Sequence, residues 1–309
     1  MALHDHEHHH DHNHSHHHAP TSFGTAFAVG TLLNGTLVVT QIVFGVLAHS
    51  TALLADAAHN FGDVLGLLLA WCASVAVRWH PTERYTYGFR PSSILAALLN
   101  AVILLIATGA IAWEAIQRWF EPHPVAGLTV MVVAAVGIVI NGLTAWMLMA
   151  GRHGDLNVRG AYLHMLGDAA VSVGVVIAGL AILLSGWNWI DPLASLVISG
   201  IIVWSTWGLL RSSLNMSLQA VPSGIEPGKV RSYLERLPGV AEVHDLHIWP
   251  MSTTETALTC HLIMPAGHPS GDFFIHVEAE LHERFRIQHP TIQIELGERP
   301  CKLAPAHVV

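Results

Sequence analysis

The chain has 309 residues, of which 52% are hydrophobic and only 12% are charged. Soluble globular domains carry about 25% charged residues, so the composition argues against a protein that faces water on all sides. The formal net charge is −8 with histidine neutral, and no basic patch with interleaved aromatic residues occurs, which argues against nucleic-acid binding. The three cysteines form neither a CxxC metal pair nor an evident disulfide framework.

The first 21 residues form a low-complexity tail in which histidine is the commonest residue. Asp, Glu, Asn and Ser interrupt the histidines, which distinguishes the tail from an expression tag. We expect residues 1–21 to be a disordered cytoplasmic segment that collects divalent metal ions weakly. The tail does not have the basic start, short apolar stretch and small-residue cleavage site of a signal peptide.

Long stretches without Asp, Glu, Lys or Arg follow the tail. Each approaches or exceeds the roughly 20 residues that a helix needs to cross a bilayer. Helices are expected because the bilayer core offers backbone groups no other hydrogen-bond partners. Turn residues divide this region into six predicted transmembrane helices, at residues 22–47, 52–78, 91–118, 125–150, 157–185 and 190–211.

The basic residues predict the orientation of these helices. Arginines occur between helices two and three and between helices four and five, and Arg and Lys follow helix six. The loops at 49–51, 121–124 and 186–191 contain neither residue. The basic loops should therefore face the cytoplasm, and an even number of spans places both termini there. We expect an integral protein of a bacterial inner (plasma) membrane, in contact with the lipid bilayer.

From about residue 222 the composition becomes that of a soluble domain. Its patterns predict a helix at 230–237, strands at 240–251 and 256–264, a helix at 273–285 and a last strand at 291–296. This αββαβ order indicates helices on one face of a three-stranded sheet. The predicted fold is therefore an all-α six-helix transmembrane bundle at 22–211, followed by a small cytoplasmic α+β domain at 212–309.

Two of the predicted spans carry a histidine and an aspartate four residues apart. These are His59 and Asp63 in the second span, and His164 and Asp168 in the fifth. Residues i and i+4 share a helix face, and ionisable side chains at membrane depth are costly, which marks them as functional candidates. Two such faces packed together supply two nitrogens and two oxygens, a set that suits tetrahedral Zn²⁺. Asp56, three residues before His59, could be a fifth ligand, but we expect it to orient the His59 ring or to have a structural role near the helix start.

The same ligands account for coupling to protons. A ligand must be deprotonated to bind metal, so metal ions and protons displace each other, and imidazole titrates near physiological pH. No G-x-x-x-x-G-K-[ST] phosphate loop occurs, so we expect transport without ATP and without an organic cofactor.

Three further candidate ligands fall on the predicted strands of the soluble domain, namely His244, His261 and Glu295. Neighbouring strands could bring them together as a regulatory metal site for Zn²⁺. The alternative is that they are ordinary core or surface residues in a chain with 24 histidines.

Six motifs in the same order resemble those of the cation diffusion facilitator family, which includes bacterial zinc, cadmium and cobalt efflux proteins and animal zinc transporters. They are HSTALLADAAHNFGDV, YTYGFRPSSILAALLNA, DLNVRGAYLHMLGDAAVSV, the turn pair Asp191-Pro192 at the start of helix six, VHDLHIW and TIQIE. The resemblance implies a homodimer of six-helix subunits, a metallochaperone-like cytoplasmic domain and metal/proton antiport. It maps the family's transport site onto His59, Asp63, His164 and Asp168, and its soluble-domain site onto His244, His261 and Glu295.

In relatives, two His and two Asp in the transport site accompany Zn²⁺ or Cd²⁺ as substrate. The resemblance implies the same substrates for this chain. Replacement of the helix-two histidine by Asp broadens the range toward iron and manganese. One departure concerns the start of helix three, where relatives often have Tyr-Gly-x-x-Arg-x-Glu. Here Ser93 stands in place of the Glu, and the basic residue is displaced.

We therefore expect a divalent metal cation efflux transporter and not an enzyme, with Zn²⁺ as the first candidate and Cd²⁺, Co²⁺ and Ni²⁺ open. A second hypothesis is a membrane metal sensor or storage protein without transport. A third, an intramembrane zinc hydrolase, ranks last because a catalytic zinc needs an open ligand position.

Overall fold

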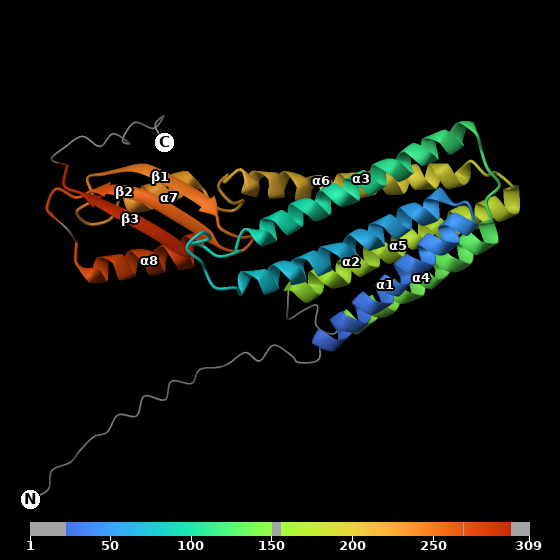
Figure 1. The fold of residues 1–309 in the computed structure, drawn as a ribbon, viewed down its shortest axis with the longest axis horizontal. Helices are drawn as coiled ribbons and strands as arrows, with labels where there is room; N and C mark the ends of the chain where they lie inside the picture. The colour runs from blue at the N-terminus through green and yellow to red at the C-terminus, as the bar shows by residue number, and fades with distance from the viewer. Residues whose placement is uncertain (1–22, 150–155, 268, 298–309) are drawn as a thin grey trace, which may run out of the picture.

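The computed structural model describes residues 23–149, 156–267 and 269–297. The histidine-rich tail and the C-terminal residues from 298, with Cys301, lie outside the described residues. The elements in chain order are α1 (Phe23–Leu47), α2 (Thr51–Val77), α3 (Ser92–Phe120), α4 (Gly127–Leu148), α5 (Leu156–Ser185), α6 (Ile190–Ser217), α7 (Pro227–Leu234), β1 (Glu242–Pro250), β2 (Thr256–Ile263), α8 (Gly271–Phe285) and β3 (His289–Glu295). Figure 1 shows α1 to α6 as one elongated bundle, with the remaining elements as a small domain at one end.

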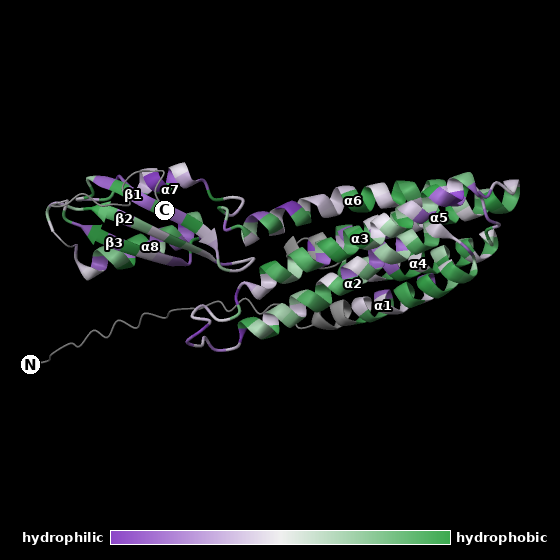
Figure 2. Ribbon diagram, turned by 45° about the horizontal axis from the view of Figure 1, so that its top comes forward, coloured by the Kyte–Doolittle hydropathy of each residue, from purple (hydrophilic) through white to green (hydrophobic). Residues whose placement is uncertain are grey.

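The six long helices expose apolar side chains on the outside of the bundle. Leu32, Leu184 and Trp204 are 73%, 79% and 82% exposed, and hydrophobic residues predominate along the six helices (Figure 2). A soluble monomer rarely exposes so much contiguous apolar surface. All six helices are long and apolar enough to cross a membrane. The predicted six-span bundle is therefore confirmed as the fold class.

One helix end differs clearly from the prediction. The sixth helix continues to Ser217, whereas the sequence pattern predicts an end near residue 211. Arg211 ends the charge-free stretch, but a helix needs no apolar residues once it has left the membrane. The extra turns of α6 lead toward the soluble domain (Figure 1).

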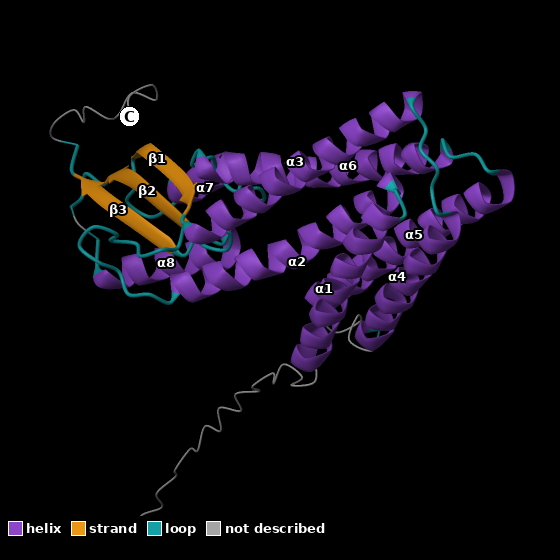
Figure 3. Ribbon diagram, turned by 45° about the vertical axis from the view of Figure 1, so that its right-hand side comes forward, coloured by secondary structure: helices purple, strands orange, loops and turns teal. Residues whose placement is uncertain are grey.

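The helices pack in close pairs. In Figures 1 and 3, α3 runs beside α6, while α1, α2, α4 and α5 form the other side of the bundle. Gly127 on α4 and Gly179 on α5 allow a backbone contact between these two helices. A Cβ atom at Gly127 would lie 2.9 Å from the carbonyl oxygen of Gly179. Small residues at such crossings allow membrane helices to approach closely.

The bundle end away from the soluble domain is tied together by Asp191, the second residue of α6. Its carboxylate is fully buried and accepts hydrogen bonds from the first residues of α2. The donors are the Ser50 hydroxyl, the Thr51 amide at 2.6 Å and the Thr51 hydroxyl at 2.8 Å. The amides at a helix start have no partner within the helix and favour negative charge. Asp191 therefore joins α6 to the start of α2.

Two more contacts close the same end. A guanidinium nitrogen of Arg118, near the end of α3, donates to the carbonyl oxygen of His49 in the turn between α1 and α2. The amide of Ala126, directly before α4, donates to the carbonyl oxygen of Ala48 at 3.2 Å. The turn between α1 and α2 thus contacts the ends of three other helices.

The soluble domain is a three-stranded sheet in the order β1-β2-β3, with β1 antiparallel and β3 parallel to β2. Its core combines one face of the sheet with α7 and α8. Leu234 from α7, Leu258 from β2 and Leu281 from α8 are all fully buried there. The predicted αββαβ order is confirmed. Burial also raises the pKa of the Cys260 thiol to about 12, so this thiol stays protonated and structural.

Three contacts connect the loop before α3 and the first turn of α3 to the soluble domain. Arg90 forms an ion pair with Glu255 at 2.6 Å, and the ring of Tyr87 lies 5.7 Å from that of His289. The Ser93 hydroxyl accepts a hydrogen bond from the Thr253 amide at 3.1 Å. Ser93 is the residue that departs from the usual Glu, so this position contacts the turn between β1 and β2 instead.

Candidate metal centres

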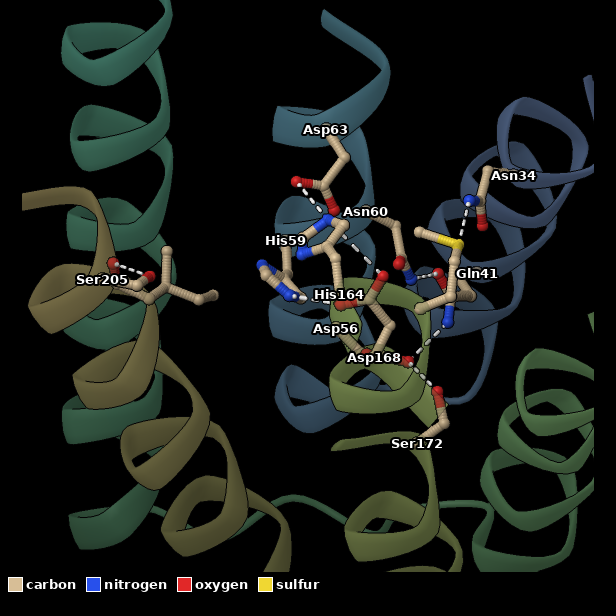
Figure 4. Close-up of polar contacts among 12 residues, drawn as sticks. Asn34, Gln41, Asp56, His59, Asn60, Asp63, His164, Asp168, Ser172 and Ser205 are labelled. Carbon is tan, nitrogen blue, oxygen red and sulfur yellow. Dashed lines mark hydrogen bonds and ion pairs between the residues drawn. The ribbon is translucent and has the colours of Figure 1, made fainter. Parts of the chain in front are cut away.

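The structure brings the four predicted residues of the membrane site together. Nε2 of His59 on α2 lies 3.0 Å from Oδ1 of Asp168 on α5. Nε2 of His164 lies 3.1 Å from Oδ1 of Asp63 and 3.7 Å from Oδ2 of Asp168. Figure 4 shows both imidazoles between the two carboxylates. Each helix thus directs its i, i+4 pair at the other helix, as the spacing predicts.

These separations are those of atoms that can share one metal ion. Zn²⁺ bonds to nitrogen and oxygen are about 2.0–2.2 Å long, which places tetrahedral donors roughly 3.3–3.6 Å apart. The three observed nitrogen–oxygen distances lie on both sides of that value. The ligand atoms of His59, Asp63 and Asp168 all lie within 4.8 Å of one another. His164 is not part of that group of three, but its Nε2 contacts two of the three members, Asp63 and Asp168.

The four side chains differ in their access to solvent. The side chain of Asp168 is 2% exposed and that of His59 is 17% exposed, whereas Asp63 and His164 are 24% and 42% exposed. Asp63 and His164 also line a cavity of about 390 Å³ between α1, α2, α4 and α5. The cavity extends along the half of these helices that is nearer the soluble domain. The cavity therefore lies on the side of the site nearer the soluble domain, while Asp168 is buried.

Asp56 lies behind the site and makes contacts of its own. Its Oδ2 accepts hydrogen bonds from Gln41 on α1 at 2.5 Å and from Ser172 on α5 at 3.2 Å. Asp56 is absent from the group of ligand atoms that surround His59. The geometry therefore agrees with a supporting position for Asp56. Its partners come from helices that no sequence spacing could have joined to it.

The three predicted residues of the soluble domain also meet. Nδ1 of His261 lies 3.0 Å from Oε1 of Glu295, and Nε2 of His244 lies 3.4 Å from Oε2 of the same carboxylate. The centroids of the two imidazole rings are 5.2 Å apart. All three ligand atoms lie within 4.8 Å of one another. His244 is buried, and neither of its ring nitrogens has a hydrogen-bond partner in the described part of the chain.

The sheet register explains this second cluster. His244 on β1 pairs directly with His261 on β2, so both side chains lie on the same face. This is the face away from the core, because the neighbouring Val243 and Leu262 pair on the core side. Glu295 pairs with Ile263, two residues after His261, and shares that face.

Sequence reasoning missed Asp245, which lies beside this cluster. A register shift between His244 and His247 adds an irregularity to β1, and Asp245 has a left-handed φ of 50° there. Such a bulge changes the direction of the side chains that follow it. Asp245 consequently contacts His247 at 2.9 Å and His261 at 3.4 Å. A strand without a bulge would place His244 and His247 on opposite faces, so no sequence pattern predicts this arrangement.

Comparison with known proteins agrees with this architecture. Residues 27–216 match the family model for the cation efflux transmembrane domain. Residues 222–296 match the model for the cytoplasmic domain of cation efflux proteins. The two matches divide the chain where α6 ends and the soluble domain begins.

Individual relatives align over most of the chain. The cation efflux system protein CzcD of Alcaligenes sp. is 35% identical over 280 residues, which are 90% of this chain and 88% of the relative. The zinc transporter ZitB of Escherichia coli is 37% identical over 87% of this chain and 85% of its own. The cadmium, cobalt and zinc/H(+)-K(+) antiporter of Bacillus subtilis is 32% identical over 85% of this chain and 86% of its own.

A six-helix membrane bundle with an intramembrane histidine–aspartate centre and an appended αββαβ domain defines a metal-ion carrier. The family match makes this assignment specific. The chain belongs to the cation efflux family, whose members are transporters of divalent metal cations.

Proposed function

We propose that this protein exports Zn²⁺ from the cytoplasm in exchange for protons, with His59, Asp63, His164 and Asp168 as the transport site. The observation that carries the proposal is the convergence of two imidazoles and two carboxylates from α2 and α5 at distances suited to one tetrahedral ion. The names of the aligned relatives, which include zinc transporters and a zinc/H(+)-K(+) antiporter, support it.

The charges of the site suit an exchange of Zn²⁺ for H⁺. Two carboxylates neutralise the two charges of the ion, which lowers the cost of holding it among apolar helices. When the ion leaves, each imidazole can take up a proton and pair with the carboxylate that it already approaches, His59 with Asp168 and His164 with Asp63. Metal and protons thus compete for the same four side chains.

The bundle offers a route to this site from one side. The cavity that Asp63 and His164 line faces the end with the soluble domain, which we place in the cytoplasm together with both termini. At the opposite end the contacts of Asp191 and Arg118 close the bundle. This conformation therefore accepts metal from the cytoplasm, and export requires a second one that opens the far end.

We further propose a regulatory role for the soluble domain, residues 212–309. His244, His261 and Glu295 would bind a Zn²⁺ that stays with the protein and is not transported. Two subunits would form a homodimer in a bacterial inner membrane. The histidine-rich tail, residues 1–21, would supply metal to the mouth of the cavity.

The test is Zn²⁺ uptake into proteoliposomes under an imposed pH gradient, with Cd²⁺, Co²⁺ and Mn²⁺ for comparison. A gradient that is acidic on the side opposite the metal should accelerate uptake. Asp168→Ala removes the buried carboxylate that both imidazoles approach, and uptake should fall about 100-fold or more because the remaining ligands cannot neutralise the ion. Glu278→Ala changes an exposed acid on α8 and is the matched control.

Two outcomes of this experiment would reject parts of the proposal. Uptake that ignores the pH gradient rejects proton antiport, and unchanged uptake in the Asp168→Ala protein rejects the site. If the wild-type protein binds Zn²⁺ but moves none under any gradient, it is a metal sensor or storage protein.

A further inference from the structure

A second group of buried polar side chains lies behind the transport site, which we call the Asp56 cluster. It consists of Gln41 on α1, Asp56 and Asn60 on α2, and Ser172 on α5, each at most 1% exposed. Asn60 donates to Oε1 of Gln41 at 3.0 Å, and Gln41 in turn donates to Asp56 at 2.5 Å. Figure 4 shows this chain of contacts beside the four proposed ligands.

The carboxylate of Asp56 is only half satisfied. Gln41 and Ser172 both donate to Oδ2. The other oxygen, Oδ1, is buried and has no hydrogen-bond partner among the described residues. Buried polar atoms normally have a partner, so an ionised carboxylate with one unpaired oxygen is costly here, and a proton on that oxygen would displace no existing donor.

No fixed positive charge balances Asp56 from the helices packed around it. The ionisable groups that face it are His59 on the same helix and Asp168 on α5. The described residues of α1 and all of α4 contain no ionisable side chain. A charged carboxylate buried among apolar helices without a paired cation is costly, and a proton bound to the group removes that charge. Such a proton on Oδ1 would leave the two hydrogen bonds to Oδ2 intact.

The position of Asp56 couples it to the metal without direct contact. It lies one helical turn before His59, and none of the described hydrogen bonds or ion pairs joins it to the four proposed ligands. A doubly charged ion at those ligands favours the ionised form of a carboxyl group nearby, and departure of the ion favours the protonated form. Binding of metal and loss of the proton are therefore linked reciprocally.

We propose that Asp56 is a proton-carrying site distinct from the metal ligands, which releases its proton when metal arrives and regains it when metal leaves. This inference rests on the proposed function, because it adds one proton to the exchange at the transport site. The ligand is H⁺ rather than a larger monovalent cation. The unpartnered oxygens of the cluster are those of Asp56 and Asn60, too few to replace the hydration shell of a metal ion.

The first test compares the wild-type protein with Asp56→Asn, which cannot exchange a proton. Zn²⁺ binding to the purified protein is measured together with the protons released into a weakly buffered solution. We expect binding to persist, about one proton fewer to be released per Zn²⁺, and uptake driven by a pH gradient to fall about tenfold or more. Thr108→Val, which removes a buried hydroxyl on α3, is the matched control.

The outcomes separate this inference from the proposed function. An Asp56→Asn protein that releases as many protons and accumulates Zn²⁺ as fast as the wild type overturns the inference and leaves the transport site intact. A wild-type protein that ignores the pH gradient overturns both. If the Asp56→Asn change removes a response to a K⁺ gradient and leaves the response to pH, the cluster binds K⁺ and the inference is wrong.

If the Asp56→Asn protein does not fold, the milder variant Ser172→Ala tests the proton-carrying role of Asp56. Ser172→Ala removes one donor to the ionised carboxylate, so the proton should be held more tightly. The midpoint of the pH dependence of transport should then move upward, by about half a pH unit to one unit. A profile that stays at the wild-type midpoint overturns the proton-carrying role.

Discussion

The membrane site and the cluster of the soluble domain use similar side chains on different supports. In the membrane, two imidazoles and two carboxylates come from α2 and α5, which contact each other there through side chains. In the soluble domain, two imidazoles and one carboxylate lie on β1, β2 and β3, whose backbones are fixed to one another by ladder hydrogen bonds. The proposed imidazole and carboxylate ligands therefore lie once between helices joined by side-chain contacts and once on a hydrogen-bonded sheet.

This difference indicates what each site can do. A shift of α2 relative to α5 separates His59 from Asp168 and breaks up the ligand set, which is what release on the far side requires. The pairing of His244 with His261 cannot change without breaking the sheet. A metal bound there can change how the domain contacts its surroundings, but the site itself stays assembled. The membrane site also has one more carboxylate with which to neutralise a divalent ion.

The largest effect that distinguishes the membrane site from the cluster of the soluble domain is expected from a change in the metal preference of the membrane site. His59→Asp replaces a nitrogen ligand by a carboxylate, which suits Mn²⁺ better than Zn²⁺. We expect the ratio of Zn²⁺ to Mn²⁺ transport to fall about tenfold or more, measured by competition in proteoliposomes.

The matched change on the surface is His276→Asp, on an exposed position of α8. It should leave the ratio at its wild-type value. Retention of the full Zn²⁺ preference in the His59→Asp protein would mean that His59 does not contact the ion.

A smaller effect is expected from the soluble cluster. His261→Ala removes the ligand that approaches both Glu295 and Asp245. Zn²⁺ binding to the full-length protein should fall by about one ion per chain, measured by equilibrium dialysis, whereas transport should change only about two- to fivefold. Acidification should also release this ion, because imidazole binds metal only when it is neutral.

The exposed His282 on α8 provides the control, as His282→Ala. Equal stoichiometry in the His261→Ala and wild-type proteins would show that the strand cluster holds no metal. A transport loss as large as that of Asp168→Ala would contradict the division into a moving and a fixed site.

The smallest effect concerns the contact between the two parts of the molecule. Arg90 and Glu255 form an ion pair whose side chains are 41% and 32% exposed, and exposed pairs contribute about 0.2–1 kcal/mol. Arg90→Glu or Glu255→Arg alone should change the transport rate about twofold. The double exchange should restore it, because the charges are then opposite again.

High salt should reduce the effect of either single change, since it screens exposed charges. If the double exchange behaves as the sum of the two single changes, the ion pair does not couple the soluble domain to α3.

Simple periodicity in the sequence predicts most of the helices and strands and several of the contacts between candidate ligands. Apolar stretches with few or no charges and of bilayer length predict the six helices, and the spacing of four residues places His59 with Asp63 and His164 with Asp168. Alternation of residues fixes the strands, and hence the shared face of His244 and His261. These features depend only on the geometry of a single helix or strand.

The remaining features depend on how distant segments meet. The hydrogen bonds of Asp56 to Gln41 and Ser172 join three helices, and no spacing along one helix predicts such partners. The register shift that brings Asp245 to His261 exists only once two strands pair. Asp191 looks like a turn residue in the sequence, yet its partners are at the start of α2.

The carboxylate of Asp191 has a consequence for the direction in which the far end can open. If α6 moved away from α2, the amide and hydroxyl groups of Ser50 and Thr51 would lose their acceptor in an apolar setting. These two helices should therefore travel together as one rigid unit. We therefore expect an exit for the ion to form between other helices, with α5, which carries His164 and Asp168, moving relative to this unit.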